Sequence, residues 1–185
     1  QEPTFYDPAK AMQILADGGW ADSNGDGIVE KDGVTAKIEL CTTTRQVRQD
    51  TLALVSAWLK AVGIDSILNP VAASDIFADY NEATLDTPCA LSTSNFDLAE
   101  HAFSSSIDPL GNYFSYHSSQ FRPDGANDAQ AKNADVDTAL DAVKNNVDFA
   151  LIKDAMATFQ TAYVNETVEI PLYYQDRPED QSREM

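Results

Sequence analysis

A chain of 185 residues can bury one core of good size, so its length predicts a single domain. Twelve lysine and arginine residues against 30 aspartate and glutamate residues give a net charge of −18 and a pI of about 4.1. A surface this acidic repels nucleic acid and anionic lipid, which excludes both as expected partners. No run of 18 apolar residues is present, so the sequence predicts no membrane span.

The first predicted helix begins at Asp7 and Pro8, which supply a capping carboxylate and a proline at the first helical position. Gly18 and Gly19 would end this helix. The face expected to be buried consists of Ala11, Met12, Leu15 and Ala16. The polar segment 22–33 then forms a loop that leads into the first strand.

The segment 37–71 is expected to organise the rest of the chain as strand, helix and strand. Residues 37–42 alternate polar and apolar side chains, which is typical of a half-buried strand. The following residues have helical spacing, with Thr44 as N-cap and Gly63 as the left-handed residue at the end. The apolar stripe of this helix consists of Leu52, Val55, Trp58, Leu59 and Val62. Residues 64–71 resume extended structure, so the pattern predicts a parallel crossover and an α/β sheet.

Less regular structure is expected after this crossover. Ser74 and Asp75 would cap a short helix, and residues 89–91 have a strand-like character. A further strand is predicted within 95–103. Residues 104–133 are rich in turn residues and aromatic side chains, and a loop of this length in a compact domain is often functional.

Two helices and a short strand close the predicted domain. Apolar residues at helical spacing mark the helices at 136–143 and 152–163, and the second would be capped by Asp148. Residues 168–174 are predicted to form a short strand. The proline within them places this strand at a sheet edge or at a strand end. We therefore expect one α/β lobe over residues 1–175 and a polar tail over 176–185.

The two cysteines, Cys41 and Cys89, leave two interpretations open. Each lies in an apolar context where a buried free thiol is common. An oxidising compartment would equally allow a disulfide. The distance between them cannot be read from the sequence, so neither interpretation is excluded.

The loop 22–33 resembles the first half of a calcium-binding loop. Oxygen ligands recur at alternate positions, and Gly27 follows at the sharp turn. The candidate Ca²⁺ ligands are Asp22, Asn24, Asp26, the backbone carbonyl of Ile28, and Asp32. The twelfth position is Gly33, where a calcium loop needs a bidentate glutamate. The alternative is therefore a hydrogen-bonded turn without metal, and a calcium-stabilised structural module is one of three functional hypotheses.

A second hypothesis is a secreted hydrolase that uses Ser105, His101 and Asp108. These residue types occur in hydrolytic triads, but the sequence lacks a nucleophile-elbow motif. His101 and His117 do not have the spacing of a zinc site, and no CxxC motif is present. We therefore expect no enzymatic activity and no required cofactor, and we interpret the histidines as packing or surface residues.

Several segments together resemble the C-terminal lobe of family-five extracellular solute-binding proteins, the dipeptide, oligopeptide and nickel binders of ABC importers. Residues 6–33 resemble the opening of that lobe, with Gly18, Gly19 and Trp20 before the acidic loop. Residues 52–64 resemble its helix-to-strand junction. Asn95, Phe96 and Asp97 resemble a strand entry, and residues 170–174 resemble a late strand. These matches follow the order of the family over nearly the whole chain.

The resemblance implies a type II periplasmic-binding fold, an α/β lobe with a mixed sheet and flanking helices. In such proteins two lobes close on a solute and pass it to a membrane permease. Full members are far longer, and the sequence starts abruptly at Gln1, so we expect an excised or mature lobe. The intact protein is expected to be extracellular or periplasmic and attached to the cell surface as a lipoprotein. The leading solute class is peptide.

The resemblance also implies which residues face the solute, namely those of the loop that follows the strand within 95–103. The candidate ligand-binding residues are Phe103, Ser104, Ser105, Ser106, Asp108 and Asn112. Peptide-binding members place an acidic side chain near the position of Ser105 to pair with the peptide's α-amino group. Here the nearest acid is Asp108, and the serines suit a peptide backbone or a sugar equally well.

Overall fold

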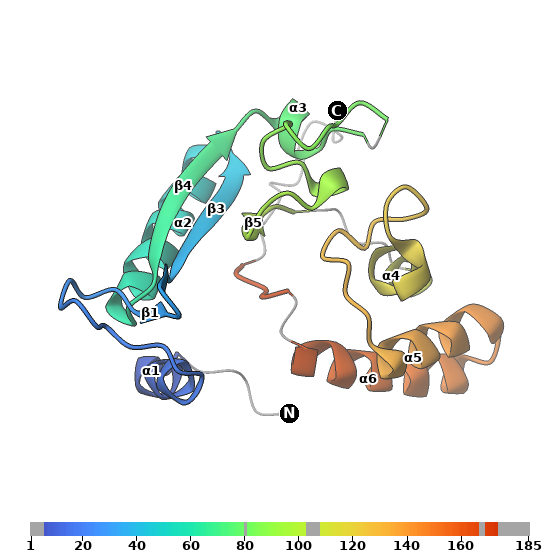
Figure 1. The fold of residues 1–185 in the computed structure, drawn as a ribbon. Helices are drawn as coiled ribbons and strands as arrows, with labels where there is room; N and C mark the ends of the chain where they lie inside the picture. The colour runs from blue at the N-terminus through green and yellow to red at the C-terminus, as the bar shows by residue number, and fades with distance from the viewer. Residues whose placement is uncertain (1–5, 80, 103–107, 167–168, 174–185) are drawn as a thin grey trace, which may run out of the picture.

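The computed structural model describes residues 6–79, 81–102, 108–166 and 169–173 (Figure 1). In chain order the elements are α1 Pro8–Asp17, β1 Glu30–Lys31, β2 Val34–Thr35, β3 Lys37–Thr43, α2 Gln46–Ala61, β4 Asp65–Val71, α3 Ala73–Ile76, η1 Leu91–Thr93, β5 Leu98–Glu100, α4 Gly111–Tyr116, η2 Ser118–Gln120, α5 Ala134–Asn145 and α6 Phe149–Glu166. The chain is therefore an α/β protein, as predicted.

The central sheet has the strand order β4-β3-β5, and all three strands are parallel. Strand β3 pairs with β4 along its whole length, from Lys37 opposite Asp65 to Thr43 opposite Val71. The short strand β5 pairs with the second half of β3. Among the described residues, antiparallel pairing is confined to the separate β1–β2 pair and to the bridge between Ala21 and Glu30. The predicted crossover through α2 is confirmed, and the three parallel strands point toward one edge.

Helix α2 covers one face of this sheet (Figure 1). Ser66 of β4 donates a 2.8 Å hydrogen bond to Ser56 of α2, and Leu52 of the helix is almost fully buried. Gly63 ends the helix with φ +90°, as predicted. The predicted N-cap is wrong, because Arg45 occupies that position and its side chain makes no capping bond. Trp58 was expected in the buried stripe but is half exposed.

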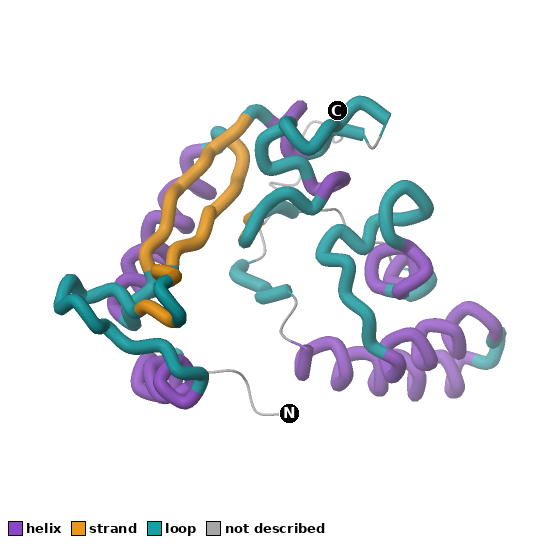
Figure 2. The backbone as a smooth tube through the Cα atoms, in the orientation of Figure 1, coloured by secondary structure: helices purple, strands orange, loops and turns teal. Residues whose placement is uncertain are grey.

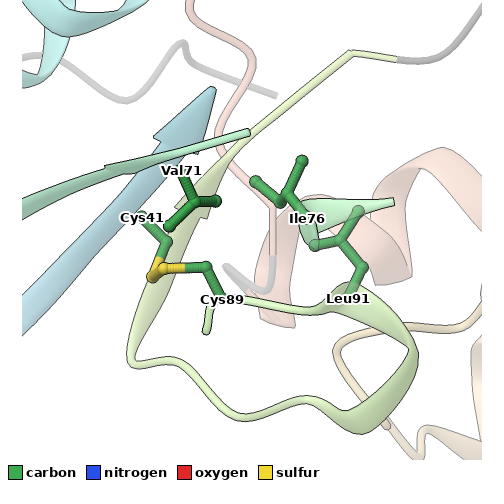
Figure 3. Packing of buried hydrophobic residues seen from close by; sticks show 5 residues of the cluster. All are labelled: Cys41, Val71, Ile76, Cys89 and Leu91. Carbon is green, nitrogen blue, oxygen red and sulfur yellow. A yellow bond between two sulfur atoms is a disulfide. The ribbon is translucent and has the colours of Figure 1, made fainter. Parts of the chain in front are cut away.

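The opposite face of the sheet is covered by a disulfide-linked cluster. Alternation along a strand places Cys41 on the face away from α2. Cys41 forms a disulfide with Cys89, so the structure favours the paired interpretation (Figure 3). Val71, Ile76 and Leu91 pack around this bond (Figure 3). The disulfide therefore fixes the chain before η1 against the central strand.

A second core lies among the C-terminal helices, which gather on the side of the molecule away from β3 and β4 (Figure 2). Val136, Ala139 and Leu140 of α5 pack against Phe159 of α6. Tyr116 brings α4 into the same cluster, with its ring 5.6 Å from that of Phe159. The apolar spacing predicted both long helices correctly.

Four further expectations about single segments are wrong. Residues 104–133 were expected to lack regular structure, but α4 and η2 lie within them. Cys89 has φ +60° and precedes a 3-10 helix rather than lying in a strand. Residues 169–173 form no strand. Helix α1 has no buried residue, because its apolar face lines an open groove of about 400 Å³ against Val62 and Gly63 instead of a packed core.

Candidate functional site

The carboxyl edge of the parallel sheet brings together the ends of β3, β4 and β5. Because the strands are parallel and in register, Thr43, Val71 and Glu100 all end their strands at this edge. The backbone N–H of Thr44 donates to the carbonyl of Val71, which joins the first two ends. Ligand clefts of α/β proteins lie beyond such edges. This edge is therefore the first place to look for a binding site.

Glu100 is the acidic side chain at this edge, and only 8% of its surface is exposed. Its Oε1 accepts a 3.1 Å hydrogen bond from the hydroxyl of Tyr173. Its Oε2 is buried and has no hydrogen-bond partner among the described residues. Burial raises the pKa of Glu100, while Tyr173 and the nearby charge of Arg48 oppose that rise. The edge thus contains a buried carboxyl group with one unsatisfied oxygen.

Arg48 adds a buried cation to the same edge, because the first turns of α2 follow directly after β3. Its Nη1 donates a 3.2 Å hydrogen bond to Oγ1 of Thr43. Only 9% of its surface is exposed. His101 follows Glu100, and burial lowers the pKa of its imidazole, which favours the neutral form. This combination can hold a polar solute through hydrogen bonds and charge.

The predicted solute-facing loop is described only in part. Phe103, Ser104, Ser105 and Ser106 lie outside the described residues. Asp108 is exposed, and its Oδ1 accepts a 2.9 Å hydrogen bond from the backbone N–H of Leu110. Asn112 donates to the carbonyl of Pro109 at 3.0 Å. The structure thus brings Asp108 and Asn112 together in one turn that stabilises the start of α4.

The acidic loop brings together two of the predicted metal ligands and one that was not predicted. Carboxylate oxygens of Asp22, Asp26 and Glu30 lie within 4.8 Å of one another. Asp32 instead occupies the turn between β1 and β2, where it is exposed and has φ +53°. Three carboxylates at this separation suit a hard cation such as Ca²⁺. Glu30 takes the place that the sequence interpretation gave to Asp32, because the β1–β2 turn carries Asp32 away from the loop.

The remaining predicted ligands of this loop serve its internal hydrogen bonds. Asn24 donates its amide N–H to Asp26 at 3.1 Å and to Glu30 at 3.0 Å. Ile28 donates its backbone N–H to Asp26 at 2.8 Å. The carboxylate of Asp22 accepts two further backbone N–H groups. In this arrangement the loop satisfies its own carboxylates, as the metal-free turn would.

His117 packs within the helical part of the chain. Its ring stacks on Tyr113 with a centroid distance of 4.3 Å, and its Nδ1 accepts from the backbone N–H of Ser119. Its Nε2 lies 3.8 Å from Asp137 and 3.6 Å from Asp141. These contacts assign the residue to the packing of η2 against α5.

Sequence reasoning missed Arg48, Glu100 and Tyr173. A signal existed for Arg48, because it lies four residues before Leu52 on the apolar stripe of α2. A charged residue at such a position has to find buried partners. Glu100 and Tyr173 had no comparable local signal, since their contact joins distant parts of the chain.

Comparison with known proteins decides the family. The model of the family described as "Bacterial extracellular solute-binding proteins, family 5 Middle" matches residues 1–124. The chain belongs to this family. It is 34% identical over 145 residues to the oligopeptide-binding protein AppA of Bacillus subtilis strain 168, which covers 77% of the chain and 25% of AppA. The predicted family resemblance is thereby confirmed.

Several solved structures share the fold of this chain. AppA in complex with a nonapeptide is 32% identical, has a TM-score of 0.69, and is matched over 86% of this chain and 29% of that one. NikZ from Campylobacter jejuni, in complex with Ni(L-His), is 22% identical with a TM-score of 0.73 over 88% of this chain and 31% of that one. A mannohexaose-bound oligopeptide-binding protein from Thermotoga maritima is 24% identical with a TM-score of 0.74 over 92% and 31%. The type II periplasmic-binding fold is therefore confirmed.

The chain described here spans about a quarter of the length of AppA. AppA is described as an oligopeptide-binding protein, so the hydrolase hypothesis gains no support from this relative. Among the described helices, none combines the length and the apolarity that crossing a bilayer requires.

Proposed function

We propose that this chain is the solute-binding lobe of an extracellular protein that delivers a peptide or a similar small solute to the permease of an ABC importer. The observation that carries the proposal is the 34% identity to an oligopeptide-binding protein of the same family. The carboxyl edge supports it, because Glu100 and Arg48 offer a buried acceptor and a buried cation where α/β proteins bind ligands.

Peptide is the proposed solute class because AppA, at 32% identity, is the relative whose structure holds a nonapeptide. The relatives with nickel or mannohexaose are less similar in sequence. In our proposal the solute is captured without chemistry and without a cofactor. The segment that follows β5 faces it, including Phe103, Ser105 and Asp108, and Glu100 lies at the start of that segment.

The proposed organisation is one lobe over residues 1–175, followed by a polar tail over 176–185, within a longer two-lobed protein. A lone lobe would bind weakly, since the contacts of the opposite lobe would be absent. We place the full-length protein outside the cytoplasm, attached to the cell surface. Closure of its two lobes would present the loaded form to the permease.

Titration calorimetry of the full-length protein with a graded panel of oligopeptides tests this function. The proposal predicts saturable binding of some peptides, and a smaller radius of gyration by X-ray scattering when the binding peptide is present. The same samples are analysed for cleavage products. Peptide cleavage would favour the hydrolase hypothesis, and a full absence of binding across the panel would contradict the proposed function.

Ca²⁺ enters the proposal as a structural ion that does not touch the solute. The supporting observation is the convergence of Asp22, Asp26 and Glu30 within 4.8 Å. To accept an ion, the loop would exchange the two hydrogen bonds that the Asn24 amide donates for metal–oxygen bonds.

A further inference from the structure

Helix α2 carries a stripe of apolar side chains that are not buried. Val47, Leu54 and Trp58 recur at helical spacing, so they lie in one row along the helix. They are 48%, 57% and 50% exposed. The face that packs on the sheet is a different one, since Leu52 on it is almost fully buried. The helix is therefore apolar on two faces, and the described residues bury only one of them.

This stripe is turned toward the side of the sheet where β5 lies. Ser56 of α2 is bonded to Ser66 of β4, so that flank of the helix faces β4. Leu54 and Trp58 are each two positions from Ser56 along the chain, which places them about half a turn away around the helix axis. Strands β4 and β5 lie on opposite sides of β3. The stripe therefore faces away from β4.

The sheet surface next to the stripe is also uncovered. Ser66, which contacts α2, pairs with Ile38, and alternation along β3 puts Leu40 on the same face. Leu98 of β5 pairs with Leu40 and shares that face. Leu40 is fully buried, whereas Leu98 is 37% exposed. None of the described helices packs extensively on β5. The stripe and Leu98 thus form the wall and the floor of an apolar step.

A further helix is the element that fits this step. Parallel sheets bury both faces under helices that pack side by side. The ends of this chain do not supply such a helix, because residues 176–185 are mostly charged and residues 1–5 are too few to run along α2. The chain spans only 25% of AppA, so a protein of that length has ample further chain to provide it.

Tyr6 indicates from which direction the covering helix arrives. Its ring lies 5.8 Å from that of Trp58, so the described chain starts beside the stripe. Ala61, on the next turn after Trp58, also lines the open groove against α1. The apolar surface therefore continues from the stripe to α1, the first described helix. Elements that are consecutive in a chain are usually adjacent in space, which favours the segment before α1 as the occupant.

We propose that a helix from the part of the full-length protein that precedes Gln1 packs on this step, with its own apolar stripe against Val47, Leu54, Trp58 and Leu98. This inference rests on the proposed function, which places the chain within a longer two-lobed protein. Covalent attachment near Tyr6 keeps the effective concentration of such a helix high. The helix would complete the cover of the sheet away from its carboxyl edge. Its role is to hold the lobe together without touching the solute.

The first test is thiol labelling of the full-length protein with N-ethylmaleimide, located by mass spectrometry. Leu54→Cys puts a thiol in the stripe, and Ala53→Cys puts one at the neighbouring exposed position of α2 as the matched control. The native cysteines are joined in a disulfide and do not react. Leu54→Cys should be modified at least about tenfold more slowly than Ala53→Cys, since a covered thiol reacts only during local opening. Both variants should react equally fast in urea. Equal rates in the native protein would overturn the proposal.

Photo-crosslinking identifies the occupant. Leu54→p-benzoylphenylalanine, irradiated in the full-length protein, should form an intramolecular product with a peptide that precedes Gln1. A product that joins two copies, that maps after Met185 or that lies only within residues 1–185 would overturn the proposal. Protection of Leu54→Cys that is lost on dilution would also overturn it, because it would assign the stripe to a second copy.

The two proposals fail separately. If the stripe is labelled freely while the full-length protein still binds peptides in the calorimetric panel, the covering helix is wrong and the proposed function stands. If the stripe is protected and crosslinks as expected while no peptide binds, the proposed function is wrong and the covering helix stands.

Discussion

The hydroxyl of Tyr173 donates a 3.1 Å hydrogen bond to Oε1 of Glu100, across 73 residues of chain. This contact ties the segment after α6 to the end of β5. It also orients the carboxylate whose second oxygen lacks a described partner. The long C-terminal helices are thereby coupled to the sheet edge that we propose as the binding site.

Removal of the Tyr173 hydroxyl should destabilise the full-length protein modestly. Tyr173→Phe is expected to lower the free energy of unfolding by about 1 kcal/mol, the usual net value of one hydrogen bond. Urea unfolding followed by circular dichroism measures it. Tyr6→Phe is the control, because Tyr6 is 68% exposed and its ring contact with Trp58 would remain. Equal midpoints for Tyr173→Phe and wild type would show that the contact contributes nothing.

The pH dependence of stability should report the burial of Glu100. Burial raises the pKa of this carboxyl above its ordinary value of 4.5, so the folded state holds the proton more tightly than the unfolded state. Its contribution to stability is therefore complete below pH 4.5 and is lost as the pH rises through the folded pKa.

Glu100→Gln removes this titration, so its unfolding free energy should fall less than that of the wild type between pH 4.5 and pH 7. Unfolding titrations at intervals of half a pH unit provide the comparison. The exposed Glu82→Gln serves as control and should follow the wild-type curve. A Glu100→Gln curve parallel to that of the wild type would rule out a raised pKa.

Loss of the disulfide should destabilise the sheet and the segment that leads from Cys89 into η1. The cysteines are 48 residues apart, and cross-linking a loop of that length is worth about 2–4 kcal/mol through the unfolded state. The paired variant Cys41→Ser/Cys89→Ser should melt at a lower temperature than the oxidised wild type. Reductant present during unfolding should lower the wild-type melting temperature and leave that of the variant unchanged. If reductant does not lower the melting temperature of the wild type, the Cys41–Cys89 disulfide is refuted.

Calcium should raise the melting temperature if the acidic loop binds it. An ion that binds only the folded state stabilises by RT ln(1 + [L]/Kd), which is about 2.7 kcal/mol at a hundredfold excess over Kd. Asp26→Asn should abolish the shift, whereas Asp32→Asn should keep it, because Asp32 lies outside the carboxylate group. If neither Ca²⁺ nor a chelator changes the melting temperature, the proposed Ca²⁺ site in the acidic loop is wrong.

The sequence predicted the crossover well because its signals are local. Alternation over β3 and helical spacing over α2 are properties of neighbouring residues, and Gly63 adopts the positive φ that its position requires. Helix α4 was missed because its six residues include a glycine and aromatic side chains, which are weak helix formers. Burial of α1 could not be judged either, since it depends on a tertiary partner.

The candidate site was predictable only in outline. Its location after β5 follows from the parallel sheet, which the sequence indicated. The chemistry at its edge does not follow, because Glu100 acquires its role through burial and through Tyr173, far along the chain. The same holds for the pairing of Cys41 with Cys89, which requires the loop before η1 to fold back on β3.

The most direct test of the central claim is mass spectrometry of the solute released by mild denaturation from the freshly purified full-length protein. The released compound is then titrated back into the refolded protein by calorimetry. We expect the released compound to be an intact peptide or a similar small solute that rebinds reversibly and is chemically unchanged after it is released again. A protein that releases no solute and binds none, or that returns the added peptide cleaved, would contradict it.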